Sequence, residues 1–258
     1  MTQRHLTIIT GASRGMGLSM ARQRLSAPGV LLCISRQTSA ELAAEASRSG
    51  ATLIQWSQDL ADTTAARARL LEWLRQQDAS AFTSATLINN AGVIPRIAPL
   101  DQCPPDELAN ALRVGLEAPM QLTAAFLQAT GAWVAQGWRG PRKVLNISSG
   151  LGRSAMASQG PYCAAKAGMD HFTRCSALDE AQRPHGARLV SLAPGVIDTD
   201  MQRQLRAGDP TAFPDRDRFV NLSTQGLLTS PEAAAARVLA YLDRPDFGVQ
   251  PVADVRDA

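Results

Sequence analysis

Apolar runs of strand length alternate with segments of helical period along nearly the whole chain. Six short runs rich in Val, Ile and Leu predict strands at residues 6–10, 30–35, 52–56, 86–89, 144–148 and 188–193. Apolar residues recurring every three or four positions predict helices at residues 15–26, 40–48, 63–77, 105–130, 159–182 and 231–242. Because parallel neighbours need crossover connections, this order predicts a doubly wound parallel sheet of about seven strands with helices on both faces. No Pro/Gly/Ser-rich linker divides the pattern, so we expect one α/β domain over residues 1–258.

Residues 196–225 break this alternation. They carry Asp, Arg, Pro and Gly with weak periodicity. An irregular segment of this length inside a compact domain is usually functional, so we expect a substrate lid here.

The composition argues against nucleic acids, membranes and metal ions as binding partners. The chain has 26 Lys and Arg against 23 Asp and Glu, which gives a net charge of +3. This excess of basic residues is too small to indicate a surface that binds nucleic acid or an anionic membrane. The four cysteines form no C-x-x-C pair and the three histidines show no metal-ligand spacing, so we expect no metal site. No apolar run approaches the length of a membrane span and no secretory leader is recognisable, so the expected location is the cytoplasm.

A glycine-rich turn joins the first predicted strand to the first predicted helix. It reads T-G-A-S-R-G-M-G at residues 10–17. Glycine permits a tight turn and a close approach of the backbone to a pyrophosphate, while the helix N-terminus presents free N–H groups to the phosphates. We therefore expect a Rossmann-type fold that binds a dinucleotide at Gly11, Ser13, Arg14, Gly15, Met16 and Gly17. A purely structural turn is the alternative.

The end of the second predicted strand bears on the choice of cofactor. A carboxylate at this place would bind the ribose 2′-hydroxyl of NAD. The chain instead has Ser35 followed by Arg36, and Arg14 could reach the same place. Two guanidinium groups suit a 2′-phosphate, so we expect NADP(H), although two solvated surface arginines remain an alternative.

Tyr162 and Lys166 lie four residues apart and share one face of a predicted helix. A free tyrosine has a pKa near 10, and a neighbouring ammonium together with the positive nicotinamide ring of the oxidised cofactor favours the phenolate and lowers that pKa. We expect Tyr162 to act as a general acid/base on an alcohol or a carbonyl oxygen, with its pKa lowered by about two units.

Together, the turn at 10–17, N-N-A-G at 89–92, Y-x-x-x-K at 162–166 and P-G at 194–195 resemble the short-chain dehydrogenase/reductase family over almost the whole chain. The resemblance implies that Ser149, thirteen residues before Tyr162, binds the substrate carbonyl and that Lys166 also holds the nicotinamide ribose. It further implies cofactor contacts at Tyr162 and at Asp59, Leu60, Asn89, Ala91, Gly92, Pro194, Gly195, Val196 and Thr199.

Within that family the chain is most similar to sepiapterin reductases and to benzil-type diketone reductases. The likeness rests on S-R at 35–36, N-I-S-S at 146–149, Y-C-A at 162–164 and the stretch 193–202. It implies reduction of a ketone or vicinal diketone on a small molecule. Asp254 aligns with an aspartate that anchors a pterin, or is simply a solvated tail residue. The family commonly pairs the helices that carry residues 115 and 162 between subunits, which implies a homodimer or homotetramer.

Gly115 stands where the family usually has an asparagine that supports a water chain to the lysine. This departure puts the proton relay in doubt, and our hypothesis is that Gly115→Asn leaves activity equal or higher. Three alternatives stay open: a 3-ketoacyl reductase, an alcohol dehydrogenase on the same fold, and a non-catalytic protein that senses NADP(H).

Overall fold

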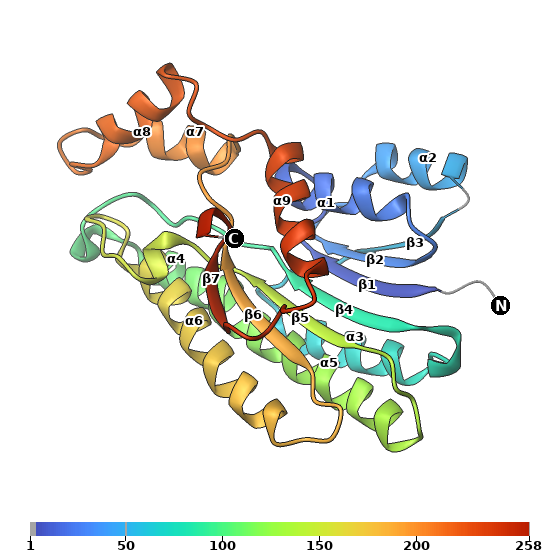
Figure 1. Ribbon diagram of the computed structural model, residues 1–258. Coiled ribbons are helices and arrows are strands. Elements are labelled where there is room, and N and C mark those ends of the chain that lie inside the picture. The colour runs from blue at the N-terminus through green and yellow to red at the C-terminus, as the bar shows by residue number, and fades with distance from the viewer. Residues whose placement is uncertain (1–3, 50, 258) are drawn as a thin grey trace.

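A computed structural model describes residues 4–49 and 51–257 of the chain. Its centre is one sheet of parallel strands in the order β3-β2-β1-β4-β5-β6-β7 (Figure 1). The strands are β1 (His5–Thr10), β2 (Gly29–Ser35), β3 (Thr52–Ser57), β4 (Ser84–Asn89), β5 (Arg142–Ile147), β6 (Arg188–Ala193) and β7 (Val252–Asp254). The strand order reverses between β1 and β4, which opens a crevice at the carboxyl ends of the strands.

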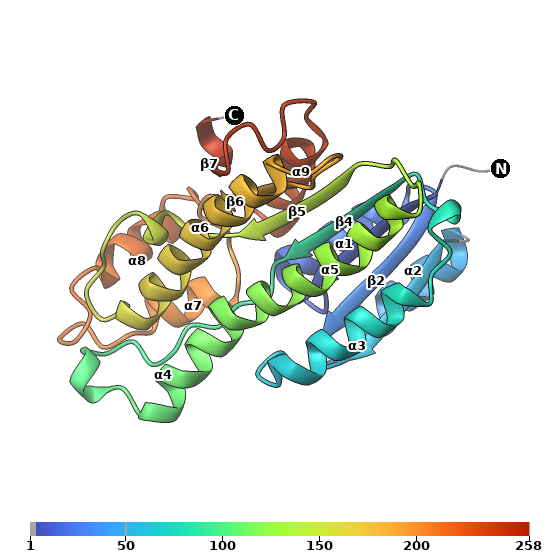
Figure 2. The same ribbon diagram turned by 90° about the horizontal axis from the view of Figure 1, so that it is seen from below.

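Helices cover both faces of the sheet. They are α1 (Gly15–Leu25), α2 (Ala40–Ser49), α3 (Thr63–Arg75), α4 (Pro105–Leu112), α5 (Ala118–Ala135), α6 (Gly160–Ala181), α7 (Asp200–Arg206), α8 (Arg216–Thr224) and α9 (Pro231–Asp243). Helices α1, α2 and α9 lie on one face, and α3, α5 and α6 lie on the other (Figures 1 and 2). Each face buries its own apolar cluster against the strands, so the sheet is covered by apolar side chains on both sides. No helix in the described part of the chain is long and apolar enough to cross a membrane.

The predicted fold class is confirmed: the sheet is parallel, doubly wound and Rossmann-type. All six predicted strands are present, with ends that differ by at most two residues. The seventh strand, β7, pairs with β6 over only three residues, Val252 to Asp254. A three-residue run carries too little periodicity to be recognised in sequence.

The helix predicted at residues 105–130 is present as a continuous helical segment over Pro105–Ala135, but it is not one regular α-helix. Helix α4 ends at Leu112, residues Arg113–Glu117 form a π-helical turn, and α5 begins at Ala118. Pro119 explains the break, because it has no N–H to donate to the carbonyl of Gly115 in an α-helical register. The two helices therefore continue in one direction with a changed register.

The segment at residues 196–225 is also more regular than expected. It contains the helices α7 and α8, which stand out from the sheet in Figure 1. Leu205, Phe213 and Phe219 pack together as a small separate apolar cluster. Because only a few apolar residues form this cluster, the hydrophobic periodicity of the segment is weak although the segment is folded.

Candidate active site

A cavity of about 970 Å³ opens at the carboxyl ends of the strands. It is lined by the glycine-rich turn, by the segments after β2, β4, β5 and β6, and by α6, α7 and α8. Nearly all residues that the sequence proposed for the site line this one cavity: Gly11, Ser13, Arg14, Gly15, Met16, Gly17, Ser35, Arg36, Asp59, Leu60, Ala91, Gly92, Ser149, Tyr162, Lys166, Pro194, Gly195, Val196 and Thr199.

Asn89 is the exception. Its side chain is buried and donates to Thr123 Oγ1 at 3.1 Å and to Asn146 Oδ1 at 2.8 Å, away from the cavity lining. The neighbouring Asn90 lines the cavity instead and donates through Nδ2 to the carbonyl oxygens of Thr10 and Gly11. The sequence predicted cofactor contacts at Asn89, Ala91 and Gly92, but not at Asn90. The Asn90 side-chain amide joins the end of β4 to the glycine-rich turn.

The glycine-rich turn has the form that a dinucleotide needs. Gly11 and Gly15 have φ of +68° and +54°, in the left-handed region that favours glycine. A Cβ on Gly11 would lie 2.9 Å from the Ala91 Cα, so only glycine permits the close packing of this turn against the segment after β4. Among the described residues no side chain caps α1, and no acidic residue lies in its first turn, which leaves its N–H groups available to an anion. These residues fit a pyrophosphate.

Both arginines that the sequence proposed for the cofactor line the part of the cavity near the glycine-rich turn and the end of β2. The Ser35 hydroxyl accepts a hydrogen bond from Ala12 N at 2.8 Å and so holds the turn to β2. Arg36 is exposed at the edge. Arg14 Nη1 lies 3.1 Å from Asp200 Oδ2 at the start of α7, and both side chains are largely exposed. Nothing in the sequence indicated that α7 places the Asp200 carboxylate next to Arg14.

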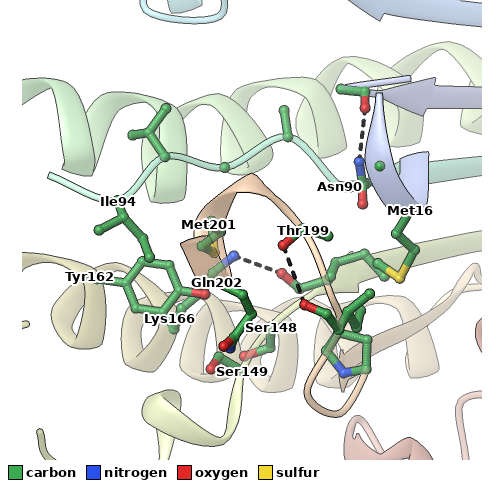
Figure 3. Close-up of a pocket in the computed structure, with 18 of the residues that line it drawn as sticks. Met16, Asn90, Ile94, Ser148, Ser149, Tyr162, Lys166, Thr199, Met201 and Gln202 are labelled. Carbon is green, nitrogen blue, oxygen red and sulfur yellow. Dashed lines mark hydrogen bonds between the residues drawn. The ribbon is translucent and has the colours of Figure 1, made fainter. Parts of the chain in front are cut away.

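The predicted catalytic groups meet at the other end of the cavity, where Figure 3 shows Tyr162, Ser149 and Lys166 away from Met16 and Asn90. Helix α6 carries Tyr162 and Lys166, with the Lys166 Nζ 5.7 Å from the centre of the tyrosine ring. Lys166 is buried and donates to the carbonyl oxygen of Ile147 at 2.7 Å. Ser149 follows β5, and its hydroxyl accepts from Leu151 N at 3.2 Å. One helix and one strand end therefore fix all three groups.

Burial is the main cause of the pKa shifts of Tyr162 and Lys166. Although part of the Tyr162 side chain faces the cavity, burial by surrounding protein raises its pKa to about 12, while a hydrogen bond with Ser149 acts in the opposite direction. Burial lowers the pKa of Lys166 to about 8, and the charge of Asp170 opposes this. In the site without a cofactor, loss of solvent therefore dominates the pKa of Tyr162. The expected lowering of this pKa included the positive charge of an oxidised nicotinamide ring, and it stays a prediction for the cofactor complex.

The motifs found in the sequence include only part of the cavity wall beside α7 and α8. Met156, Met201 and Phe219 provide apolar surface, and Gln202 provides an amide. Ile94, which follows the N-A-G turn, lines the same region. These positions are scattered along the chain without a shared motif, and only the fold brings them together.

Asp254 lies at the cavity rim as the last residue of β7 and is 6% exposed, not a solvated tail residue. Its carboxylate pairs with Arg256 at 2.6 Å and 2.8 Å. The hydrogen bond from Arg256 is the main cause that lowers the pKa of Asp254, so the group is an anion at neutral pH.

Comparison with known proteins agrees with this geometry. A family model described as short chain dehydrogenase matches residues 5–210. The chain belongs to the short-chain dehydrogenase family. As a member of it, the protein is an oxidoreductase built on a single Rossmann-type domain.

Among relatives of this short-chain dehydrogenase, a benzil reductase ((S)-benzoin forming) of Bacillus cereus is 34% identical over 240 residues, 93% of this chain and 94% of that protein. A sepiapterin reductase of Meriones unguiculatus is 31% identical over 258 residues, covering 93% of this chain and 92% of its own. The predicted likeness to these two groups is confirmed.

The fold itself matches the structure of a 3-oxoacyl-[acyl-carrier protein] reductase from Brucella melitensis in complex with NAD. The TM-score is 0.80 at 24% identity, over 99% of this chain and 96% of that one. Another structure of the same fold, from Agrobacterium tumefaciens, holds NADP. Solved relatives of this short-chain dehydrogenase thus carry either nicotinamide dinucleotide.

Proposed function

We propose that this short-chain dehydrogenase reduces a ketone or vicinal diketone of a small molecule to an alcohol with NADPH, and that Tyr162 is its general acid/base. One observation carries the proposal: Tyr162, Ser149 and Lys166 line the same cavity as the uncapped N-terminus of α1. A proton donor, a hydroxyl that can bind a carbonyl and a phosphate-binding turn are the parts that such a reduction needs.

The residues have distinct tasks in this reaction. When bound, the reduced dinucleotide supplies the hydride. Ser149 binds the substrate carbonyl oxygen next to the Tyr162 hydroxyl. With a pKa of about 12, Tyr162 carries its proton at neutral pH and donates it to the oxygen as negative charge develops there. The Lys166 ammonium, 5.7 Å from the tyrosine ring centre, stabilises that negative charge.

NADPH is favoured over NADH because cations and no acid lie at the end of β2. Ser35 and Arg36 follow the strand where an acidic residue would select NAD, and Arg14 faces the same cavity. Asp59, Leu60, Pro194, Gly195, Val196 and Thr199 also line the cavity. The first two are proposed to contact the adenine, and the other four the nicotinamide. These residues are proposed to hold the two ends of the cofactor.

The substrate class follows from the relatives and from the wall of the cavity. A benzil reductase and sepiapterin reductases cover almost the whole chain. Apolar side chains of Ile94, Met156, Met201 and Phe219 line the lid side, which suits an organic carbonyl compound with apolar substituents. We further propose that residues 196–225 close over the substrate as a lid, since α7 and α8 both line the cavity.

A homodimer or homotetramer in the cytoplasm completes the proposal. Leu112, Met120 and Leu178 are exposed by 41%, 46% and 70% on α4, α5 and α6, the helices that the family commonly pairs between subunits. Large exposed apolar side chains on such faces are typical of subunit contacts.

The deciding experiment follows the loss of NADPH absorbance with benzil, diacetyl, sepiapterin and acetoacetyl thioester as substrates. We expect turnover of a diketone, a kcat/KM at least about tenfold higher with NADPH than with NADH, and loss of turnover by about a thousandfold or more in Tyr162→Phe. Tyr241→Phe, on the outer helix α9, is the matched control and should retain full activity.

Each alternative has its own outcome in this assay. Preference for the thioester would indicate a ketoacyl reductase. Faster turnover in the reverse assay, in which the corresponding alcohols and NADP⁺ give a gain of NADPH absorbance, would indicate an alcohol dehydrogenase. Binding of NADPH without turnover of any substrate would overturn the proposal in favour of a sensing protein.

A further inference from the structure

Asp170 is a buried acid that the mechanism above does not use. It lies on α6 one helical turn after Lys166 and is 1% exposed. Its Oδ1 accepts hydrogen bonds from the hydroxyls of Ser148 and Ser191, each at 2.6 Å. Its Oδ2 is buried without a hydrogen-bond partner in the described part of the chain. A buried carboxylate with an unpaired oxygen is costly, so a nearby cation must compensate for its charge.

The nearest cations to consider are Arg153 and Lys166. Arg153 Nε lies 3.8 Å from Asp170 Oδ2, too far for a hydrogen bond, and its side chain is one-third exposed. Lys166 is buried beside Asp170 on the same face of α6, and its ammonium bonds to a neutral carbonyl oxygen. Two opposite buried charges one turn apart stabilise each other in a medium of low polarity.

Asp170 also holds the segment that carries the substrate-binding serine. Ser148, which donates to Asp170, is the neighbour of Ser149. The turn at Gly150–Gly152 packs so closely that a Cβ on Gly152 would lie 2.8 Å from Asp170 Oδ2. The carboxylate thereby ties the end of β5, β6 and the turn after Ser149 to the helix of Tyr162 and Lys166.

We propose that Asp170 is a positioning residue of this active site, which keeps Lys166 in its charged form and fixes the Ser148–Ser149 segment against α6. Its part in the reaction rests on the proposed reductase function, but its effect on Lys166 does not. Asp170 thus stabilises the charged form of Lys166 in a chain that has Gly115 where the family usually has an asparagine near this lysine.

Other charged groups around this face are few. They are Arg153 after the Gly150–Gly152 turn, Asp254 and Arg256 from the β7 end, and the exposed Arg113 and Glu117 from the π-helical turn packed on α6. Asp254 and Arg256 already pair with each other. The pKa of Lys166 is lowered by burial, and in the described residues Asp170 is the charge that raises it.

The sequence allows a direct measurement on the cofactor-free protein. The chain has only two lysines, Lys143 and Lys166. In protein labelled with ¹³C at the lysine ε-carbon, NMR titration therefore follows Lys166 by itself, and Lys143→Arg assigns the signals. We expect Asp170→Asn to lower the titration midpoint of Lys166 by about one pH unit or more. The Lys143 midpoint should stay unchanged, because Lys143 lies at the opposite end of β5.

Two variants separate charge from structure. Ser191→Ala removes one hydrogen bond of Asp170 but keeps its charge, and Asp179→Asn makes the same substitution at an exposed position on α6. Both should leave the Lys166 midpoint within about 0.3 units of wild type. If Asp170→Asn does not fold, Asp170→Ser removes the charge in a smaller volume and should give the same shift.

Activity provides the second readout. With NADPH and the best diketone, the fall of kcat at high pH should move to lower pH in Asp170→Asn by the shift seen in the NMR titration, with little change in KM. An unchanged Lys166 midpoint in Asp170→Asn, or an equal change in Ser191→Ala, would overturn the inference. An NMR shift in a protein that turns over no substrate would leave the effect on Lys166 standing and reject the proposed function instead.

Discussion

At the scale of single residues, the sequence predicted which candidate side chains come together, but it did not predict their environment. The spacing of Tyr162 and Lys166 on one helix face is fixed by the helix itself, so the sequence was sufficient to pair them. Their pKa values depend on how much solvent the fold removes, which spacing does not contain. Asp170 was overlooked for the same reason, because only the fold shows that this helix position is buried next to two serines.

Packing also changes what we expect at Gly115. A Cβ at this position would lie 3.0 Å from the Cβ of Ala165, the residue before Lys166. The hypothesis that asparagine would be harmless is therefore replaced. We expect Gly115→Asn to destabilise the fold by about 1–3 kcal/mol and to lower kcat, because overpacking here pushes α6 and its lysine outward. Thermal unfolding and steady-state rates measure the two effects.

Gly131→Ala is the matched control for Gly115. Gly131 lies inside α5, and a Cβ there would have nothing nearer than Arg142 Nη1 at 3.9 Å. Alanine should stabilise this helix by about 0.5–1 kcal/mol. A double variant with Ala165→Gly should recover most of the loss in Gly115→Asn. Wild-type stability and activity in Gly115→Asn alone would disprove the packing argument.

At the scale of elements, helices were predicted correctly where the hydrophobic pattern extends over many residues. They were predicted less well where a proline interrupts the helix or where the helix is short. Helices α1, α2, α3, α6 and α9 begin and end within two residues of their predicted limits. The break between α4 and α5 follows from a single proline, Pro119, inside an otherwise continuous apolar pattern. Helices α7 and α8 are short and rest on one small apolar cluster, so their periodicity is too weak to detect.

The contact between α7 and the glycine-rich turn leads to a prediction on cofactor affinity. Asp200 pairs with Arg14 at 3.1 Å and with Arg203 at 2.6 Å. A 2′-phosphate would have to compete with this carboxylate for Arg14 and would be repelled by it. Because exposed ion pairs are weak, we expect Asp200→Asn to tighten NADP⁺ binding by only about two- to fivefold and to leave NAD⁺ binding unchanged.

Isothermal titration calorimetry of both dinucleotides measures this effect. Asp217→Asn is the control, since Asp217 is an exposed acid that pairs with Arg216 on the neighbouring helix α8. Equal tightening for NADP⁺ and NAD⁺ in Asp200→Asn would show that Arg14 does not meet the 2′-phosphate.

At the scale of the whole molecule, the sheet has two apolar clusters that stabilise the fold and one polar edge that carries the site. Burial at that edge acts against stability, because Lys166 is enclosed there with its charge. The general architecture could be predicted from the alternation of strands and helices alone. The sequence alone could not predict that Lys166 lies inside the fold and thereby links stability to pH.

This link has a definite sign. Below about pH 8 Lys166 is charged in both the folded and the unfolded state, and the folded state bears the full cost of burying it. Between its folded pKa of about 8 and its ordinary value of 10.5, the unfolded state holds the extra proton, so stability rises with pH. The gap corresponds to about 3 kcal/mol at most. Two groups act in the opposite direction, because burial raises the pKa of each to about 12 in the folded state. In the unfolded state the Cys33 thiol ionises above about pH 9 and the Tyr162 phenol above about pH 10.

Urea unfolding of the cofactor-free protein at several pH values should therefore show a free energy of unfolding that rises from about pH 8 toward pH 9, levels off as Cys33 opposes Lys166, and falls above about pH 10. Lys166→Met should remove most of the rise, whatever its effect on stability at a single pH, because methionine has no proton to exchange. Lys143, whose pKa burial also lowers, contributes in the same direction, so Lys143→Met should remove a smaller part. Parallel pH curves for wild type and Lys166→Met would mean that Lys166 is solvated in solution, and its charge would then be too well screened to assist Tyr162.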